Sequence, residues 1–279
     1  MFVRLQLTLF LSLCFFLNGY SEEKNASHTS PKKNDFLAAT DWSDGKAEIL
    51  IYSVQKSYRG DNLNFPAQCL TEKKFLNKKN GVLSHKSGDG LQSIFASSFH
   101  FQFNSESLLH SYAISIQMSA EHPMHLLRQE TSLQSWSGLS YRLLETEEDK
   151  TKFSVFSSGQ ESDRDVVLDK PGLLTEEMLF TYLRSIPLET GYSEEIWLLD
   201  NSFGDKSSAN VQYAKLYVLS KTNTVHEILT WLVEVQKADG QKISFWISAE
   251  GLHPVVCANL SDKSIWNLET IQRKKYWSW

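Results

Sequence analysis

The sequence contains little cysteine: Cys14, Cys69 and Cys257 are the three in a chain of 279 residues. Two thiols outside the N-terminal segment do not have the spacing of a metal site, which argues against a cysteine-ligated metal centre. Cys69 and Cys257 are a candidate disulfide, and so long a loop would restrict the unfolded chain by about 5 kcal/mol. Two buried free thiols are the alternative, and both interpretations stay open at this point.

The chain has no excess of positive charge, and long apolar runs are scarce. The formal net charge is −5 at pH 7, whereas a chain-wide nucleic-acid surface normally shows as a basic domain. We therefore expect no nucleic-acid partner. Beyond the N-terminal segment no apolar stretch reaches the roughly 18 residues that a membrane helix needs, so a helical membrane protein is not expected either.

The N-terminal segment has the three parts of a secretory signal peptide. Arg4 supplies a positive charge, residues 5–17 form an apolar run, and Gly19 and Ser21 place small residues before a cleavage site. This pattern predicts a signal peptide over residues 1–21. The protein is then exported, to the periplasm or outside the cell, where disulfides can form.

A lipid anchor at Cys14 is not expected, because Leu13 stands where a lipid-attachment signal requires a small residue. Residues 22–35 are polar and charged and show no periodicity, which indicates a disordered linker. The remaining residues, 36–279, are predicted to form a single β-rich domain.

Alternation with period two is the main signal in this domain, and it is typical of strands with one buried face. In residues 94–103 the even-numbered side chains are mostly polar and include His100. The opposite face carries Phe95, Phe99, Phe101 and Phe103. Further strands are predicted over residues 48–54, 112–118, 139–144, 152–157, 211–219, 228–236 and 242–248. The last two are joined through Asp239 and Gly240, a typical hairpin turn.

A single helix is predicted after Thr175, a good N-cap, and it ends before Pro187. Its apolar residues form one stripe, which indicates a helix packed against a sheet. With many strands, one helix and no βαβ rhythm, we predict a mainly β fold. The expected architecture is a curved antiparallel sheet, barrel-like or half-barrel, with one short packing helix; a β-sandwich is the alternative.

Several short motifs follow one another at the start of the domain: Asp41-Trp42-Ser43-Asp44-Gly45-Lys46-Ala47-Glu48, Tyr52 with Gln55, Ser57-Tyr58-Arg59-Gly60, and Thr71-Glu72. This block resembles the opening of a family of exported bacterial proteins of unknown function. Its members read Trp-x-Asp-Gly-Lys-Ala-Glu, Tyr-x-x-x-Gln and Arg-Tyr-Gly. Residues 131–138 and 153–163 resemble a second, looser block of that family.

The resemblance covers about the first half of the mature chain and then fades. Where the family tends to have Cys and His beside a Trp, this chain has Ser137 and Leu139. A Cys/His site of that kind is therefore absent here. The resemblance implies export and one domain, and it implies no catalytic activity.

Two groups of carboxylates are candidates for glycan or ester hydrolysis, which uses paired acids. One group is Glu161, Asp163 and Asp165; the other is Glu145, Glu147, Glu148 and Asp149. Each lies in a predicted connection between strands, so solvated acidic loops are the alternative. No Gly-x-Ser-x-Gly motif is present, which argues against a serine hydrolase.

His122 and His125 have the i, i+3 spacing of metal ligands, but they fall in a predicted loop with no acidic partner nearby. No His-Glu-x-x-His motif accompanies them. We therefore predict exposed loop histidines, no metal and no cofactor.

The hypothesis that follows is an exported domain that binds an apolar or amphipathic ligand, or an envelope component, without catalysis. The candidate ligand-binding residues are His100, Trp136, Glu161 and Asp163. The candidate partners are an apolar small molecule or lipid, and peripheral contact with a membrane or the envelope. An envelope hydrolase using the clustered carboxylates, and a structural or assembly protein of the envelope, are the alternatives.

Overall fold

The computed structural model describes residues 36–105, 108–135, 138–147, 150–157, 164–199, 210–223 and 227–275. The described residues belong to one compact unit. The predicted signal peptide and the linker that follows it lie outside the described residues. No helix in the described ranges is long and apolar enough to span a membrane.

The described chain forms one sheet of 16 strands, one α-helix and one short 3-10 helix, η1 (Thr40–Ser43). The strands are β1 (Ala47–Tyr58), β2 (Asp61–Asn77), β3 (Leu83–Ser84), β4 (Leu91–Ser105), β5 (Leu108–Ser119), β6 (Leu126–Ser135), β7 (Gly138–Glu147), β8 (Lys150–Ser157), β9 (Arg164–Leu168), β10 (Leu173–Thr175), β11 (Ser193–Leu199), β12 (Val211–Asn223), β13 (Leu229–Lys237), β14 (Lys242–Ser248), β15 (Val255–Asn259) and β16 (Ile265–Lys274).

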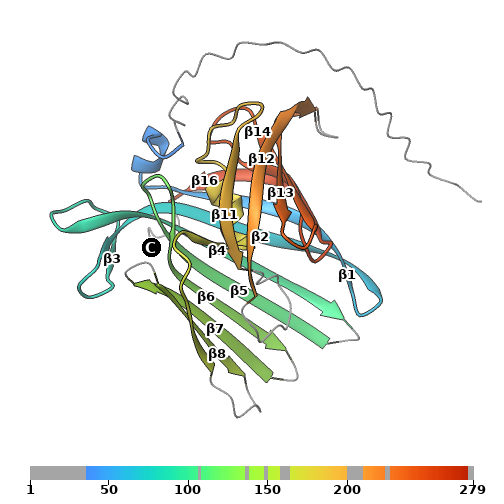
Figure 1. The fold of residues 1–279 in the computed structure, drawn as a ribbon, viewed down its shortest axis with the longest axis horizontal. Coiled ribbons are helices and arrows are strands. Elements are labelled where there is room, and N and C mark those ends of the chain that lie inside the picture. Colours follow the sequence, from blue (N-terminus) through green and yellow to red (C-terminus); the bar gives the residue numbers. More distant parts are fainter. Residues whose placement is uncertain are drawn as a thin grey trace, which may run out of the picture. The chain divides into compact units, whose positions relative to one another are not determined.

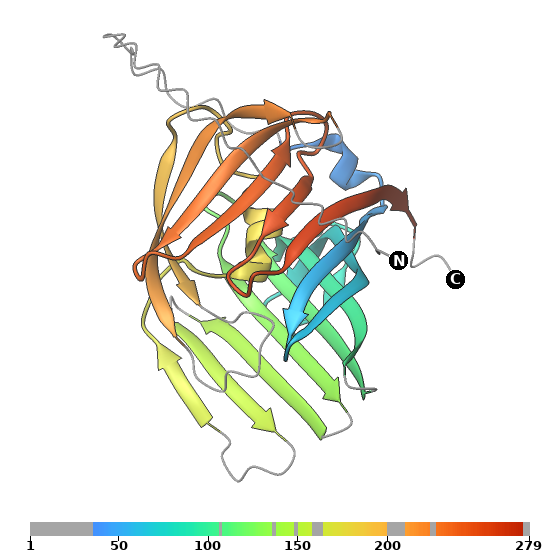
Figure 2. The same cartoon turned by 90° about the vertical axis from the view of Figure 1, so that its right-hand side faces the viewer.

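The order of these strands shows how the chain builds the sheet. From β1 the strands β2 and β4–β9 follow outward in chain order, and the chain then passes to β10 at the opposite edge (Figure 1). Strands β11–β16 lead back until β16 pairs with β1. Neighbouring strands are antiparallel, except for β10 and β11, which are parallel. The two edge strands, β9 and β10, are not paired with each other, so the curved sheet does not close into a barrel (Figure 2). The predicted half-barrel is confirmed, and the two-sheet sandwich is not what forms.

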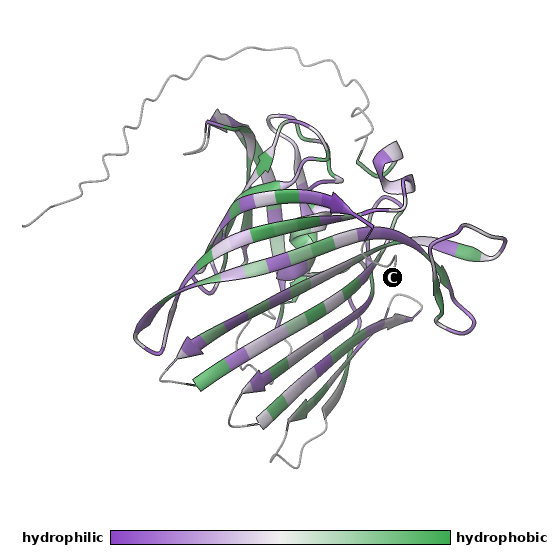
Figure 3. Ribbon diagram, turned by 180° about the vertical axis from the view of Figure 1, so that it is seen from behind, coloured by the Kyte–Doolittle hydropathy of each residue, from purple (hydrophilic) through white to green (hydrophobic). Residues whose placement is uncertain are grey.

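Alternating side chains divide the sheet into two faces, as the hydropathy along the strands shows (Figure 3). Phe95, Phe99, Phe101 and Phe103 are buried on the face that we call the inner face, while His100 is exposed on the outer face. The same alternation on β5 buries Tyr112, Ile114, Ile116 and Met118, and it continues across the neighbouring strands in register. The hairpin through Gly240 joins β13 to β14, as predicted.

The helix α1 (Glu176–Tyr182) packs on the inner face. It begins where expected: the Thr175 hydroxyl accepts a hydrogen bond from the Met178 backbone N–H at 3.4 Å. All seven of its residues are buried, rather than the one stripe that the sequence predicts. The difference arises because the helix is covered on more than one side, which leaves none of its faces to solvent.

Phe180 on α1 is the centre of the apolar packing. Its ring makes edge contacts, at centroid separations of 5.3 to 5.7 Å, with four aromatic rings from strands β1, β4, β14 and β16: Tyr52, Phe99, Phe245 and Trp266. These strands come from both halves of the chain. The helix therefore joins the early and the late strands through one aromatic cluster.

Ion pairs at the two ends of the helical segment accompany this packing. Lys237 on β13 donates to Glu176 at 2.7 Å, with both side chains fully buried. After the helix, Arg184 donates to both carboxylate oxygens of Glu48 on β1, at 2.7 and 3.0 Å, and to the backbone carbonyl of Leu252. Buried charges are tolerated when they are paired in this way, and removal of one partner is costly.

We expect Phe180→Ala to lower the free energy of unfolding by about 3–5 kcal/mol, because it empties the centre of the aromatic cluster. The measurement is urea unfolding followed by tryptophan fluorescence. Phe156→Ala is the matched control: Phe156 is 46% exposed on β8, so we expect a change within about 0.5 kcal/mol. Equal losses in the two variants would show that α1 is not the centre of the packing.

We expect Lys237→Met to destabilise the fold by about 3–5 kcal/mol, because it leaves the Glu176 carboxylate in the interior without its counter-charge. Adding Glu176→Gln should restore much of the loss, which a double-mutant cycle in urea measures. The control is the exposed pair Lys242–Glu234, where Lys242→Met should cost no more than about 1 kcal/mol. A double variant as unstable as Lys237→Met alone would contradict this account.

Candidate functional site

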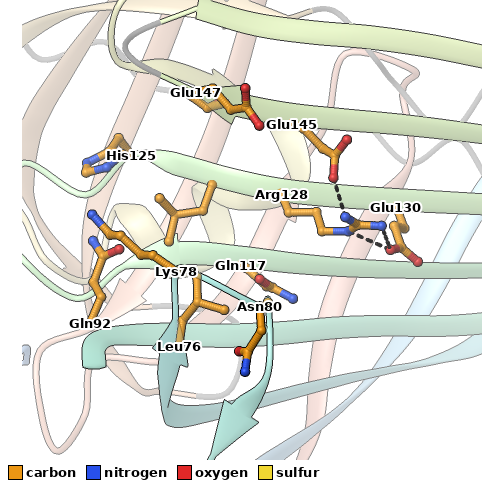
Figure 4. A pocket seen from close by; sticks show the side chains of 13 residues that line it. Leu76, Lys78, Asn80, Gln92, Gln117, His125, Arg128, Glu130, Glu145 and Glu147 are labelled. Carbon is orange, nitrogen blue, oxygen red and sulfur yellow. Dashed lines mark hydrogen bonds and ion pairs between the residues drawn. The ribbon is translucent and has the colours of Figure 1, made fainter. Parts of the chain in front are cut away.

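A hollow of about 820 Å³, lined by described residues, lies on the outer face of the sheet. We call it the outer groove. The end of β2 and the turn that follows it form one wall, with Leu76, Lys78 and Asn80, and Glu147 on β7 forms the other (Figure 4). The floor between them is made by strands β5 and β6 and by Glu145 of β7.

The register of the strands explains why polar side chains gather on this floor. Gln117, Arg128 and Glu145 are cross-strand partners on β5, β6 and β7, so they share the outer face. Their neighbours Ile116 and Leu144 point to the inner face and are buried. Leu127 adds apolar surface to the floor, beside a bulge between β5 and β6.

Arg128 organises the charges in the groove. Its guanidinium donates to Glu130 at 2.7 Å and also to Glu145 (Figure 4). Burial lowers the pKa of Arg128, but the hydrogen bond to Glu130 and the two nearby carboxylates outweigh this effect and raise it. One cation therefore compensates two carboxylates in the floor.

Two charged groups of opposite sign remain on the facing walls. Lys78 and Glu147 are both exposed, and neither has an ion-pair partner among the described residues. Leu76 and Leu127 are partly exposed between the walls. The groove thus offers a free ammonium, a free carboxylate and apolar surface to one ligand.

Of the residues predicted to bind a ligand, His100 is the one within the described ranges, and it does not line this groove. His100 is exposed on the outer face of β4 and lines a separate hollow of about 470 Å³, together with Gln68, Gln102 and Ser111. Trp136, Glu161 and Asp163 lie outside the described residues. Glu145 and Glu147, from the second predicted acidic group, do line the outer groove.

His125, in the loop after β5, is half-buried rather than fully exposed. His125 Nδ1 lies 3.0 Å from the Ser119 hydroxyl, and the side chain reaches one end of the outer groove. Within the described ranges there is no group of three or more His, Cys, Asp or Glu residues that could hold a metal ion.

The two cysteines are free thiols in the structure, which corrects the candidate disulfide. Cys69 is on β2 and Cys257 on β15, and strands β16 and β1 lie between them. Three strand spacings amount to roughly 14 Å, about twice the Cα separation that a disulfide allows. Burial raises the pKa of Cys69 to about 12 and that of Cys257 to about 11, so both remain protonated near neutral pH.

The aromatic side chains of the inner face lie against one another. Phe101 stacks on Tyr112 at a centroid separation of 4.7 Å, and Phe103 stacks on both Phe65 and His110 at 5.0 Å. All five rings are buried. In this arrangement they pack the interior, and the hollows described above are on the outer face.

Glu177 at the start of α1 is a buried acid with few partners. Gln129 Nε2 lies 3.5 Å from one of its oxygens, while the other has no hydrogen-bond partner. Burial raises the pKa of the Glu177 carboxyl to about 7, and the charge of Glu176 acts in the same direction. The carboxyl is therefore half protonated near neutral pH.

Comparisons of this chain with protein-family models, with curated proteins and with solved structures found no match. The resemblance of the N-terminal block to a family of exported proteins therefore stays a prediction.

The sequence alone did not predict the wall of the outer groove that carries Leu76 and Lys78. A usable signal was present, because Asn80-Gly81 is a common hairpin turn, and here Gly81 has a φ of +71°. The turn joins β2 to the short strand β3, which places Lys78 and Asn80 over the groove.

We expect Glu177→Gln to remove a pH-dependent contribution to the free energy of unfolding. The folded-state pKa of about 7 exceeds the ordinary value of 4.5, so this group stabilises the fold most at low pH. The contribution, about 3 kcal/mol, is lost as the pH rises through 7.

Urea midpoints at pH 5, 6, 7 and 8 measure this effect. The wild-type protein should lose stability over this range relative to Glu177→Gln, whose neutral amide does not titrate. Glu269→Gln, at an exposed position on β16, is the control and should follow the wild type. The assignment is wrong if Glu177→Gln also follows the wild type.

Proposed function

We propose that this chain is an exported, non-catalytic binding domain, and that its outer groove binds an amphipathic ligand carrying both a positive and a negative group. The observation that supports the proposal most directly is the pair Lys78 and Glu147, two uncompensated charges of opposite sign on facing walls. Leu76 and Leu127 between them suit an apolar part of the same ligand.

The state of the floor carboxylates favours binding over hydrolysis. A glycosidase needs one carboxyl that gives up a proton and a second that is free to act as nucleophile or base. Glu130 and Glu145 instead share the guanidinium of Arg128. In this arrangement their charges serve to hold the floor of the groove together.

Lysophosphatidylcholine is a suitable probe, because it joins an apolar chain to a head group with both charges. Binding to the full chain is measured by isothermal titration calorimetry below the micelle concentration. We expect Lys78→Gln and Glu147→Gln each to weaken binding by about fivefold, which is about 1 kcal/mol for one partly exposed charge contact. Leu127→Gln should weaken it further, because it removes apolar surface from the floor.

Two controls make the result specific. Lys79→Gln removes the neighbouring lysine, which is exposed but does not line the groove, and Leu229→Gln changes a leucine that is 41% exposed on β13. Neither should alter the affinity. Absence of binding, or equal losses in the control variants, would refute the proposal.

A further inference from the structure

A second hollow, of about 580 Å³, lies at the end of the sheet where β1 begins. We call it the cationic pocket. It is bounded by η1 and the residues that lead into β1, by β2 and β4, and by the residues that follow β3. Lys73 and Phe75 on β2, with Ser93 on β4, contribute from the inner face, so the pocket is separate from the outer groove.

The charge that lines this pocket is of one sign. Lys46, Lys73 and Lys86 contribute three ammonium groups, and His85 lies beside them. No aspartate or glutamate is among the residues that line it. In a chain with a net charge of −5, three lysines that line one pocket with no lining aspartate or glutamate form a local region of positive charge.

The nearest acids are already paired, and one of them is paired in part with Lys46 of the pocket itself. Asp44 accepts from Arg273 at 3.0 Å and lies 3.6 Å from the Lys46 ammonium. Glu72 is buried and paired with Lys74, and one of its oxygens is 4.0 Å from His85 Nδ1. Neither carboxylate neutralises Lys73 or Lys86.

Two polar groups in the pocket wall, the Lys73 ammonium and the Ser93 hydroxyl, are incompletely paired among the described residues. The Lys73 ammonium donates to the Leu37 carbonyl at 3.2 Å but has no carboxylate partner among the described residues. Burial lowers the pKa of Lys73, which reflects the cost of holding this charge partly away from water. The Ser93 hydroxyl oxygen is buried and has no hydrogen-bond partner.

The remaining wall is formed by aromatic residues and by small residues. Trp42 and Phe75 provide apolar surface, while Ser43, Gly45 and Ser87 leave room and add two hydroxyl groups. The volume exceeds what a simple inorganic ion fills. The pocket therefore suits an anionic group attached to a larger body.

We propose that the cationic pocket binds the phosphate group of a phosphorylated ligand. A phosphate monoester carries close to two negative charges and three acceptor oxygens, which match the ammonium groups of Lys73 and Lys86 and the adjacent hydroxyls, with Lys46 beside them. A soluble phosphate monoester and the head group of phosphatidic acid, which is itself a phosphate monoester, share this chemistry. The proposal does not depend on the outer groove, because the two sites have different walls and ligands of different charge.

Glycerol 3-phosphate is the soluble probe, added to the full chain and followed by ³¹P NMR and calorimetry. Binding should weaken about tenfold in Lys86→Gln and at least as much in Lys73→Gln, because each removes one ammonium contact to phosphate. Lys86 is exposed, so Lys86→Gln tests the pocket even if Lys73→Gln folds poorly. Lys79→Gln, an exposed lysine outside the pocket, should bind as the wild type does.

A vesicle arm separates the two sources of phosphate. Cosedimentation compares phosphatidylcholine vesicles with vesicles that also contain phosphatidic acid. Binding to glycerol 3-phosphate that depends on Lys86 supports a soluble monoester. Binding confined to phosphatidic acid vesicles, and lost in Lys86→Gln, supports a lipid head group. Absence of both, or an equal loss in Lys79→Gln, overturns the proposal.

Discussion

The pairing of buried charges around α1 is the constraint on which the rest of the structure depends. Glu176 and Lys237 are fully buried together, and Arg184 reaches Glu48 on β1 from the other end of the helical segment. The desolvation penalty of a charge in the interior is offset only when its partner is held in place. The ion pairs therefore require β1, β13 and the helix to keep one relative position, and the aromatic cluster around Phe180 fills the space between them.

This internal arrangement determines where a ligand can be bound. The inner face is occupied by its own rings and by the helix, so the outer groove and the cationic pocket lie at places where the sheet meets its hairpins and its N-terminal residues. Strand β2 is central to both sites, because it continues beyond the start of β1. Its outward side chain Leu76 lines the groove, and its inward side chains Lys73 and Phe75 line the pocket.

The strands with strict alternation could be predicted, and strands with local interruptions could not. Strand β4, with four phenylalanines on one face, was evident from its pattern. Strand β2 was missed because Pro66 and a polar beginning resemble a loop. In the structure the pairing of β2 with β4 begins at Ala67, directly after the proline that cannot donate a hydrogen bond. Neither candidate site could be found this way, because the walls of each come from segments far apart in the chain.

By itself the sequence determined the alternating strands, the helix with its Thr175 cap, and a β-rich class, because these depend on local periodicity and local hydrogen bonding. Only the tertiary structure decided that Cys69 and Cys257 stand three strand spacings apart, that Glu176 finds Lys237, and that Lys46, Lys73 and Lys86 converge. Such pairings depend on strand order and register. Both are set only when strands from different parts of the chain come together in one sheet.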